Sequence, residues 1–497
     1  MDNNMNINFQ RNNLIFGDNL EIMERYMPDK CVDLIYLDPP FSSNRNYNQI
    51  IRDPNDNFDT AQVEAFDDTW SWNDTTEDTF RQLQSLHKGE DVVNTVEGFY
   101  QILRNNSLMA YLIMMTPRLL EMKRLLKDTG SIYLHCDPAA SHYLKIIMDA
   151  IFCIENFRNE IVWCYKGWNT KQKQFPSKHD IILFYTKTSN NVFNILYQPL
   201  RNERLKKYGT KKLKNIIVNG KMKLVPTEEE SLGSIIPDWW EIQYLARASK
   251  ERIGYPTQKP LELVERIIHA SSNKNNIIFD PFCGGGTTLH AAHNLNRRFI
   301  GIDITTNAIA LIKIRLLNFC NLQEDKDYII EGEPKTHQQA EELAEMDKYK
   351  FQGWVISKLN ALPGKMKGNG IKKGKDGGID GRRTFKSSQN KNVGHIIISV
   401  KGGKNVTLSC VRDLGGTIDT DGALGGVFVS LDTASPDKRQ YAFDQGTFEW
   451  DGKQYPKLQF LTHKDLIAGN YGSLPPLNIS YGADILQKTH SNELLEF

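Results

Sequence analysis

The sequence predicts an α/β protein in two parts: a mostly parallel sheet with helices on both faces, followed by a smaller α/β domain. Short apolar runs that end in Asp, Pro or Gly alternate with segments of helical periodicity, as in parallel strands joined by crossover helices. At 497 residues the chain is too long for one ordinary domain. After about residue 330 the composition changes, and a Gly- and Lys-rich stretch follows at 364–381. We therefore place one domain at 1–330 and the other at 331–497.

The expected elements follow one another along the chain. Strands are expected within 12–41 and at 132–135, 161–164, 181–185, 276–280, 298–302 and 395–401, and helices at 20–27, 108–126, 287–295 and 338–346. The helix 108–126 is expected to stop at Lys127-Asp128-Thr129-Gly130, because a glycine just past the last periodic residue is a common C-terminal signal. A helix between successive strands allows those strands to run parallel.

The tetrapeptide Asp38-Pro39-Pro40-Phe41 closes the apolar run 32–37. An exocyclic amine of adenine or cytosine is a poor nucleophile, and a catalyst activates it by accepting hydrogen bonds from its N–H groups. The Asp38 carboxylate and the Pro39 carbonyl supply two acceptors, held by the fixed torsions of two prolines. Phe41 offers a face on which a flipped-out base can stack. The motif predicts methylation of an amino group, and the alternative is a strand that ends in ordinary turn residues.

A second motif begins where the strand 276–280 runs into a Gly-rich loop before the helix 287–295. Gly284 and Gly286 let the backbone approach a ligand closely, and the helix that starts at Thr287 offers free amide donors. The next strand ends at Asp303, which is 303 − 280 = 23 residues after Asp280. Rossmann-like folds hold ribose hydroxyls with an acidic residue near this spacing, so the loop predicts a cofactor site.

These motifs, in this order, resemble the circularly permuted or β-class group of S-adenosylmethionine-dependent DNA amino-methyltransferases, in which the catalytic motif precedes the cofactor motif. The match extends over about 12–330 and includes a segment similar to the family's PTQKP at 256–260. The resemblance implies a Rossmann-like methyltransferase fold and catalytic roles for Asp38, Pro39, Pro40 and Phe41. It also implies cofactor contacts, with Asp18 at the adenine and Lys259 at the methionine end; the full set is Asp18, Lys259, Asp280, Phe282, Gly284, Gly286, Thr287 and Asp303.

The implied reaction moves a methyl group from S-adenosylmethionine to the N6 amine of adenine in double-stranded DNA. Adenine is preferred because Asp-Pro-Pro-Phe resembles the adenine enzymes. Cytosine N4 stays open as an alternative, since Ser-Pro-Pro-Tyr is commoner in the cytosine enzymes. A module of the same fold that only binds DNA is disfavoured, because both motifs are intact.

DNA contact is expected in the region 188–250, which resembles the family's variable target-recognition region. The formal net charge is only +1, with 61 Lys and Arg against 60 Asp and Glu, so binding must come from a local patch. Such a patch is almost unopposed by acidic residues: Arg201, Arg204, Lys206, Lys207, Lys211, Lys212, Lys214, Lys221 and Lys223. We expect it to contact phosphates. The alternative is a solvated basic surface.

The second domain resembles the PD-(D/E)xK nuclease core of Mrr-like restriction endonucleases. Asp380 and Lys401 lie 401 − 380 = 21 residues apart around a Gly-rich turn and an apolar strand. The resemblance implies that Asp380 holds Mg²⁺ and that Lys401 orients the attacking water. Ser399 departs from the family, which carries Glu, Asp or Gln there, and Glu342 or Glu345 could supply the missing ligand. A restriction-modification system follows from this combination; the alternative is a domain that only binds DNA.

Other classes of protein are disfavoured. The 7 cysteines are scattered without metal or disulfide spacing, and His135-Cys136-Asp137 is interpreted as structural. No Walker-type phosphate loop occurs, so ATP-driven translocation is not expected. The polar N-terminus and the lack of a long apolar run predict a cytoplasmic protein without a membrane span. The oligomeric state is left open, with a homodimer as one alternative to a monomer.

Overall fold

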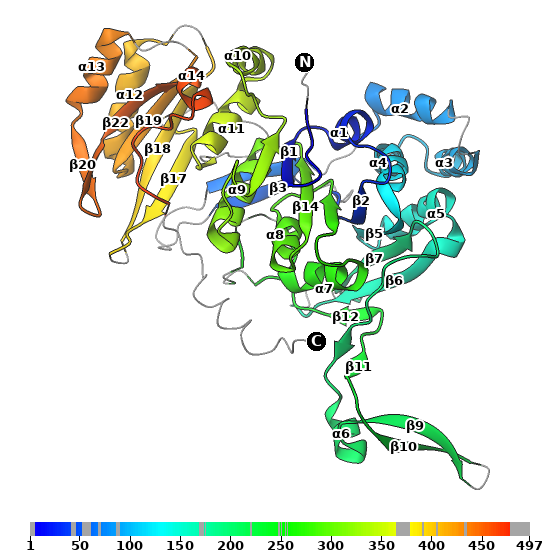
Figure 1. Cartoon of the computed structure of the whole chain (residues 1–497). Helices are drawn as coiled ribbons and strands as arrows, with labels where there is room; N and C mark the ends of the chain where they lie inside the picture. Colours follow the sequence, from blue (N-terminus) through cyan, green and yellow to red (C-terminus); the bar gives the residue numbers. More distant parts are fainter. Residues whose placement is uncertain are drawn as a thin grey trace.

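A computed structural model (Figure 1) describes every residue except 1–4, 41–45, 52–60, 68–70, 86–89, 168–172, 174, 219–220, 247–248, 250, 254, 256, 364–377, 390–391, 404–405, 432–434 and 478–497. Phe41 of the first motif, and two residues of the segment 254–260, therefore lie outside the described residues.

A nine-stranded sheet forms the first part of the protein, in the order β12-β6-β7-β5-β2-β13-β14-β1-β15. Its strands are β1 (Asn12–Phe16), β2 (Val32–Leu37), β5 (Leu126–Cys136), β6 (Phe157–Cys164), β7 (His179–Thr186), β12 (Trp239–Glu241), β13 (Ile277–Asp280), β14 (Arg298–Asp303) and β15 (Tyr328–Glu331). Strand β7 runs antiparallel to both of its neighbours, and the other pairs are parallel. The mostly parallel sheet is therefore confirmed.

Helices cover both faces of this sheet (Figure 1). One face packs against α1 (Asn19–Tyr26), α2 (Asp74–Gln84), α3 (Glu90–Leu103), α4 (Ser107–Leu125) and α5 (Ser141–Phe152). The other packs against α7 (Leu261–Ser271), α8 (Thr287–Asn294) and α9 (Thr306–Cys320). Side chains alternate along β2, so that Ile35 and Leu37 join the first core while Leu34 and Tyr36 join the second. Both faces of the strand are buried, as expected for a central parallel strand.

The end expected for the helix 108–126 is confirmed to within one residue, but the turn expected at 127–130 is wrong. Helix α4 ends at Leu125, and strand β5 begins at once with Leu126, so that 127–130 belong to the strand. Leu126 pairs with Val32 of β2, and Lys127 forms an ion pair with Asp33 at 2.9 Å. Pairing with a neighbouring strand thus overrides the local turn preference of the glycine.

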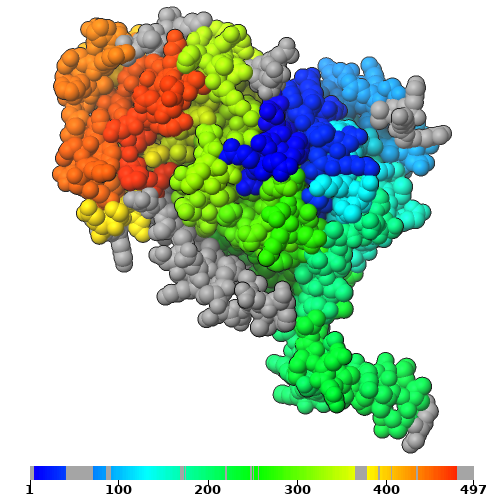
Figure 2. All heavy atoms as spheres, in the orientation of Figure 1, coloured from blue at the N-terminus to red at the C-terminus, as the bar shows by residue number. Residues whose placement is uncertain are grey.

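The region expected to recognise DNA forms an arm that projects from the body (Figures 1 and 2). It contains β8 (Tyr197–Gln198), α6 (Asn202–Tyr208), β9 (Lys211–Val218), β10 (Lys221–Glu230) and β11 (Ser234–Ile235). Strands β9 and β10 form a two-stranded antiparallel ribbon, and β8 and β11 pair at its base. Elsewhere, β3 (Asn46–Ile51) pairs with β4 (Ala61–Asp67), and a short 3-10 helix, η1, spans Ile154–Asn156.

The C-terminal part is built on a separate five-stranded sheet in the order β16-β17-β18-β19-β22. Its elements are α10 (His337–Met346), α11 (Lys348–Lys358), β16 (Leu362–Pro363), β17 (Gly381–Lys386), β18 (Val393–Lys401), α12 (Leu408–Asp421), β19 (Gly425–Ser430), α13 (Pro436–Asp444), β20 (Thr447–Trp450), β21 (Lys453–Pro456), β22 (Leu458–Thr462) and α14 (His463–Ile467). Two apolar cores lie on its faces. This is the smaller α/β fold that the sequence predicts, and its boundary at 330/331 stays a prediction.

Helix α9 of the first part packs against α11 of the second. The contact is close because Gly353 has no side chain: a Cβ there would lie 1.8 Å from Thr306 Oγ1. Lys313 of α9 donates to the Ser357 carbonyl oxygen at 3.1 Å. Among the residues that the structure describes, no helix is long and apolar enough to cross a membrane.

Candidate functional site

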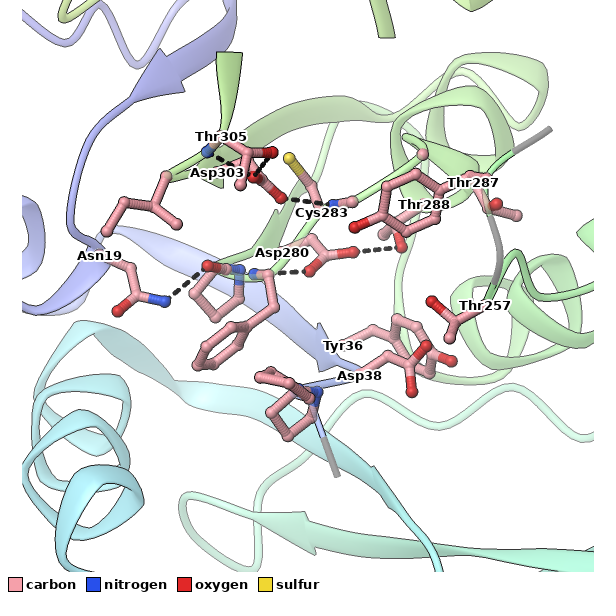
Figure 3. A pocket seen from close by; sticks show the side chains of 18 of the residues that line it. Asn19, Tyr36, Asp38, Thr257, Asp280, Cys283, Thr287, Thr288, Asp303 and Thr305 are labelled. Carbon is pink, nitrogen blue, oxygen red and sulfur yellow. Dashed lines mark hydrogen bonds between the residues drawn. The ribbon is translucent and has the colours of Figure 1, made fainter. Parts of the chain in front are cut away.

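A cavity of ≈ 480 Å³ lies where the central strands β2, β13 and β14 end (Figure 3). The predicted site residues that line it are Asp18, Asp38, Pro39, Pro40, Lys259, Asp280, Phe282, Gly284, Thr287 and Asp303. Gly286 lies between two lining residues, at the N-cap of α8. Segments far apart in the sequence thus meet in one place, at the carboxyl ends of parallel strands where α/β proteins bind ligands.

The direction of the Asp38 side chain follows from the alternation of side chains along β2. Asp38 lies two positions after Tyr36, which lies two positions after Leu34, so alternation directs Asp38 toward the side of α7. There its carboxylate Oδ2 accepts a hydrogen bond from Lys259 Nζ in an ion pair whose side chains are 17% and 10% exposed, respectively. Pro39 and Pro40 leave this end of the strand little backbone freedom.

The Gly-rich loop has the glycines that its packing requires. Gly284 and Gly286 have φ of +47° and +72°, a region that residues with a Cβ seldom adopt. The ring of Tyr255 lies on the loop, and a Cβ at Gly284 or Gly285 would approach it to 2.9 or 3.0 Å. Asp303 Oδ2 accepts a hydrogen bond from the Gly284 N–H at 2.9 Å, which ties the loop to the end of β14. The loop is therefore closely packed and forms part of the cavity wall.

Two further carboxylates in the cavity have raised pKa values. Burial raises the pKa of Asp280 to about 7, although its Oδ2 accepts from Thr288 Oγ1 at 2.5 Å and its Oδ1 from the Phe282 N–H at 3.0 Å. Burial also raises the pKa of Asp303 to about 6, against hydrogen bonds from the N–H and Oγ1 of Thr305. Neither carboxylate has an ion-pair partner in the described part of the chain, so the cavity favours a cationic ligand.

Asp18 stands at another edge of the cavity, with its carboxylate already engaged. Its Oδ1 caps helix α1 by accepting from the Leu20 and Glu21 N–H groups, and its Oδ2 pairs with Arg118 at 2.9 Å. Its neighbour Asn19 donates to the Pro281 carbonyl oxygen at 2.7 Å and so joins the first strand-helix turn to the Gly-rich loop (Figure 3). Sequence reasoning missed Asn19 and Arg118, whose only signal is the place of Asn19 beside a predicted site residue.

A buried polar network extends from the cavity into the sheet. Tyr36 Oη lies 3.0 Å from Nδ1 of the fully buried His135, and His135 Nε2 lies 3.2 Å from Asp180 Oδ2. Tyr165 donates to Asp180 Oδ1 at 3.4 Å. The structural interpretation of 135–137 stays a prediction. His135 connects the cavity residue Tyr36 to Asp180, a connection that no sequence motif indicates.

In the C-terminal sheet, Asp380 directly precedes β17, and Lys401 is the last residue of the neighbouring strand β18. Asp380 Oδ2 accepts from the Val400 N–H at 2.6 Å, and its Oδ1 accepts from Gln352 Nε2 of α11 at 2.8 Å. Ser399 and Lys401 share one face of β18 and line a hollow of ≈ 700 Å³ together with Arg412 and Asp413 of α12. Gln352, which sequence reasoning missed, is thus an upstream side chain in contact with Asp380. The metal-binding role suggested for Glu342 or Glu345 stays a prediction.

Acidic residues neutralise part of the arm's basic patch, although the sequence predicted a patch with almost no acidic neighbours. Lys211 pairs with Glu230 at 2.5 Å and Lys212 with Glu229 at 2.7 Å, because β10 returns its glutamates beside the first lysines of β9. Farther out, Lys214, Lys221 and Lys223 share one face of the ribbon and form no ion pair with described residues; the other face carries Leu213, Ile217, Met222 and Leu224. On the ribbon itself, the lysines without an ion pair to described residues thus lie away from its base.

The fold and cavity define an α/β enzyme with a ligand site at the carboxyl ends of its strands. The family model described as DNA methylase matches residues 32–313, which is more than half of the chain, and the chain therefore belongs to that family. A second model, described as restriction endonuclease, matches residues 343–458. The chain is a fusion of a DNA methylase and an Mrr-like restriction-endonuclease domain.

Individual relatives agree with this assignment. The type II methyltransferase M.EcaI of Enterobacter cloacae is 26% identical over 352 residues, or 59% of this chain and 66% of that enzyme, so slightly less than two thirds of its length is spanned. The DNA adenine methyltransferase YhdJ of Escherichia coli is 25% identical over 339 residues, or 68% of this chain and 88% of that enzyme. The solved PvuII cytosine-N4-specific DNA methyltransferase is 14% identical and covers 63% of this chain and 88% of its own, with a TM-score of 0.38, too low to carry an argument.

Proposed function

We propose that this chain transfers a methyl group from S-adenosylmethionine to the N6 amine of adenine in double-stranded DNA. The observation that carries the proposal is the single cavity in which Asp38, Pro39 and Pro40 meet the Gly-rich loop and Asp303. The Asp-Pro-Pro-Phe motif and the similarity to an enzyme named for adenine support N6 of adenine. N4 of cytosine is the alternative.

The cavity fits this methyl donor in charge and shape. The donor supplies an electrophilic methyl group on a cationic sulfonium and also carries an ammonium group. Asp280 and Asp303 provide negative charge, and the glycines 284–286 leave room for close approach of a ligand. Asp303 Oδ1 accepts two hydrogen bonds from Thr305, whereas Oδ2 accepts from the Gly284 N–H and keeps a second lone pair with which it can accept from a ribose hydroxyl. We assign the adenine end to the side of Asp18 and Phe282, and backbone contacts to Gly284, Gly286 and Thr287.

In the reaction itself, the chain binds and polarises the amine. Asp38 Oδ1 and the Pro39 carbonyl oxygen accept its two N–H groups, which localises the nitrogen lone pair for attack on the methyl carbon. Because two prolines fix the backbone, these acceptors need no reorganisation when the base arrives. Stacking of the flipped base on Phe41 stays a prediction outside the described residues.

DNA contact is assigned to the arm. Lys214, Lys221 and Lys223 are exposed on one face of the β9-β10 ribbon and are suited to phosphate oxygens. The salt dependence of binding tests this assignment: replacing one of these lysines by Met should lower the slope of log affinity against log salt by about 1. A homodimer stays a prediction, which light scattering of the free protein and of its DNA complex tests.

The test of the main proposal is transfer of labelled methyl groups. Purified protein is incubated with labelled donor and with duplex DNA or RNA of the same sequence, and incorporation into DNA is expected. Wild-type protein that binds the donor but labels neither polymer would refute the proposal and favour a DNA-binding module. Label in RNA alone would assign a different substrate.

We further propose metal-dependent DNA cleavage by the C-terminal domain, with Asp380 as a Mg²⁺ ligand and Lys401 orienting water. Support comes from the pairing of β17, which Asp380 directly precedes, with β18, which ends at Lys401, and from the family match. Because Ser399 and Gln352 are neutral, we expect weak metal binding and slow cleavage. Plasmid incubated with Mg²⁺ or Mn²⁺ tests this, and unmodified plasmid should be cut faster than methylated plasmid. If no metal and no methylation state gives cutting, the domain only binds DNA.

A further inference from the structure

The ion pair between Lys259 and Asp38 assigns a new role to the lysine of the 256–260 segment. We propose that Lys259 is a positioning residue that holds Oδ2 of the Asp38 carboxylate and leaves Oδ1 directed at the target amine, instead of a ligand for the methionine end of the cofactor. This inference rests on the proposed methyl transfer for its catalytic consequence only.

The chain fixes Lys259 by fastening the segment on both sides of it. Gln258 Oε1 accepts from the Ile253 N–H at 2.9 Å, and Gln258 Nε2 donates to the Glu251 carbonyl oxygen at 2.8 Å. Glu251 Oε1 in turn accepts from the Leu261 N–H at 2.7 Å, in the first turn of α7. Pro260 is the N-cap of the same helix and restricts the backbone next to Lys259. The residues on both sides of Lys259 thus hold the backbone of the segment in place. The Lys259 side chain forms the ion pair with Asp38.

Burial explains why the pair must form. The Lys259 side chain is only 10% exposed, and a buried ammonium is strongly unfavourable without a counter-charge. Asp38 supplies that charge, so Lys259 already has a balancing carboxylate before any ligand enters. A lysine whose charge is balanced in this way attracts the carboxylate of the cofactor less strongly than an unpaired one.

A second carboxylate stabilises the ammonium from the sheet side. Burial pushes the pKa of Asp180 upward, but the hydrogen bond from His135, the charge of His135 and the charge of Lys259 outweigh it and lower that pKa. Asp180 is therefore negative and within electrostatic reach of Lys259, while His135 and Tyr165 hold it in place. Two carboxylates thus attract the ammonium, Asp38 after β2 and Asp180 in β7, and strand β5 lies between these two strands.

The consequence for the reaction is geometric. A carboxylate without a partner can rotate about its Cβ–Cγ bond and present either oxygen in many orientations. With Oδ2 bound to a fixed ammonium, Oδ1 has one direction, and Pro39 fixes the neighbouring carbonyl acceptor. Loss of such positioning costs about 100-fold in rate when the reacting groups are misplaced by about 1 Å.

The experiment compares Lys259→Met with Lys259→Gln in the full chain, by calorimetry of cofactor binding and by kcat at saturating cofactor and DNA. The Met side chain fills similar space without a hydrogen-bond donor, whereas Gln can still donate to Asp38 Oδ2. We expect both variants to bind S-adenosylmethionine as wild type does, with kcat reduced about 100-fold for Met and clearly less for Gln. Lys127→Met is the matched control, because Lys127 pairs with Asp33 on the same strand β2 but far from the cavity.

The two measurements separate the possible outcomes. Weaker cofactor binding in both variants, with kcat at saturation unchanged, would overturn the proposal. Lys259 would then be a ligand for the methionine end of the cofactor. Cofactor binding also shows that each variant is folded. If Lys127→Met lowered kcat as much as Lys259→Met does, the loss would reflect reduced protein stability and would overturn the positioning role. If wild-type protein binds the cofactor but methylates nothing, the proposed function fails, while the binding isotherms still decide whether Lys259 contacts the cofactor.

Discussion

Cofactor binding should depend on pH through Asp280 and Asp303, whose raised pKa values of about 7 and about 6 arise from burial. A cationic ligand favours their ionised forms, so binding should release protons and strengthen as pH rises through this range. Below about pH 7 the ligand's own ammonium stays protonated, since α-amino groups titrate near 7.7–8.0. Between pH 5.5 and 7, a change in cofactor affinity therefore reflects ionisation of the protein's carboxylates and not of the ligand.

The magnitude follows from the two pKa values. At pH 6.5, Asp280 is about 75% protonated and Asp303 about 25%, so cofactor binding should release about one proton. Between pH 7 and pH 5.5 the ionised fraction of Asp280 falls from about one half to about 3%, which weakens the apparent affinity about 15-fold. Asp303 adds a further factor of about 4 by the same reasoning.

Calorimetry in buffers of different ionisation enthalpy measures both the affinity and the number of protons released. Asp280→Asn should remove most of the proton release at pH 6.5, and Asp128→Asn, on the surface, should leave it unchanged. An affinity that is flat from pH 5.5 to 7, with no proton exchanged, would refute the idea that these buried carboxylates face the cationic ligand.

Three further predictions address the remaining residues. Asp38→Ala should abolish methyl transfer while calorimetry still detects the cofactor; turnover above a few per cent of wild type would remove Asp38 from the activation of the amine. Asp303→Ala should weaken cofactor binding by roughly 1.5 to 3 kcal/mol, the scale of a charge-assisted hydrogen bond, and an unchanged isotherm would contradict its placement. Asp380→Ala and Lys401→Ala should each abolish metal-dependent plasmid cleavage, and cutting that survives both would place the nuclease elsewhere.

The parts of the site that the sequence could predict are mostly those marked by local motifs. Asp38, Asp280 and Asp303 each end a buried strand, and parallel strands bring their carboxyl ends to one edge of the sheet, so their meeting in one cavity follows from the fold. The Gly-rich loop was equally readable, because positive φ and the close approach of Tyr255 both demand glycine.

Contacts between distant segments could not be predicted in this way. Lys259 and Asp38 form an ion pair although they are 221 positions apart, and no local pattern indicates which cation meets a given carboxylate. His135 and Asp180 are neighbours only because β7 inserts antiparallel beside β5, a pairing that strand periodicity does not specify. The contact of Gln352 with Asp380 could not be predicted for a different reason, since a neutral amide carries no charge that marks it as a metal-site neighbour.

The central claim is that one cavity presents an amino group of a DNA base to a methyl donor through Asp38. Mass spectrometry of nucleosides, released from duplex DNA after incubation with S-adenosylmethionine and either wild-type protein or Asp38→Ala, tests it most directly. We expect N6-methyladenine with the wild type and none with the variant. N4-methylcytosine instead would contradict the assignment to adenine, and equal methylation by both proteins would contradict the role of Asp38.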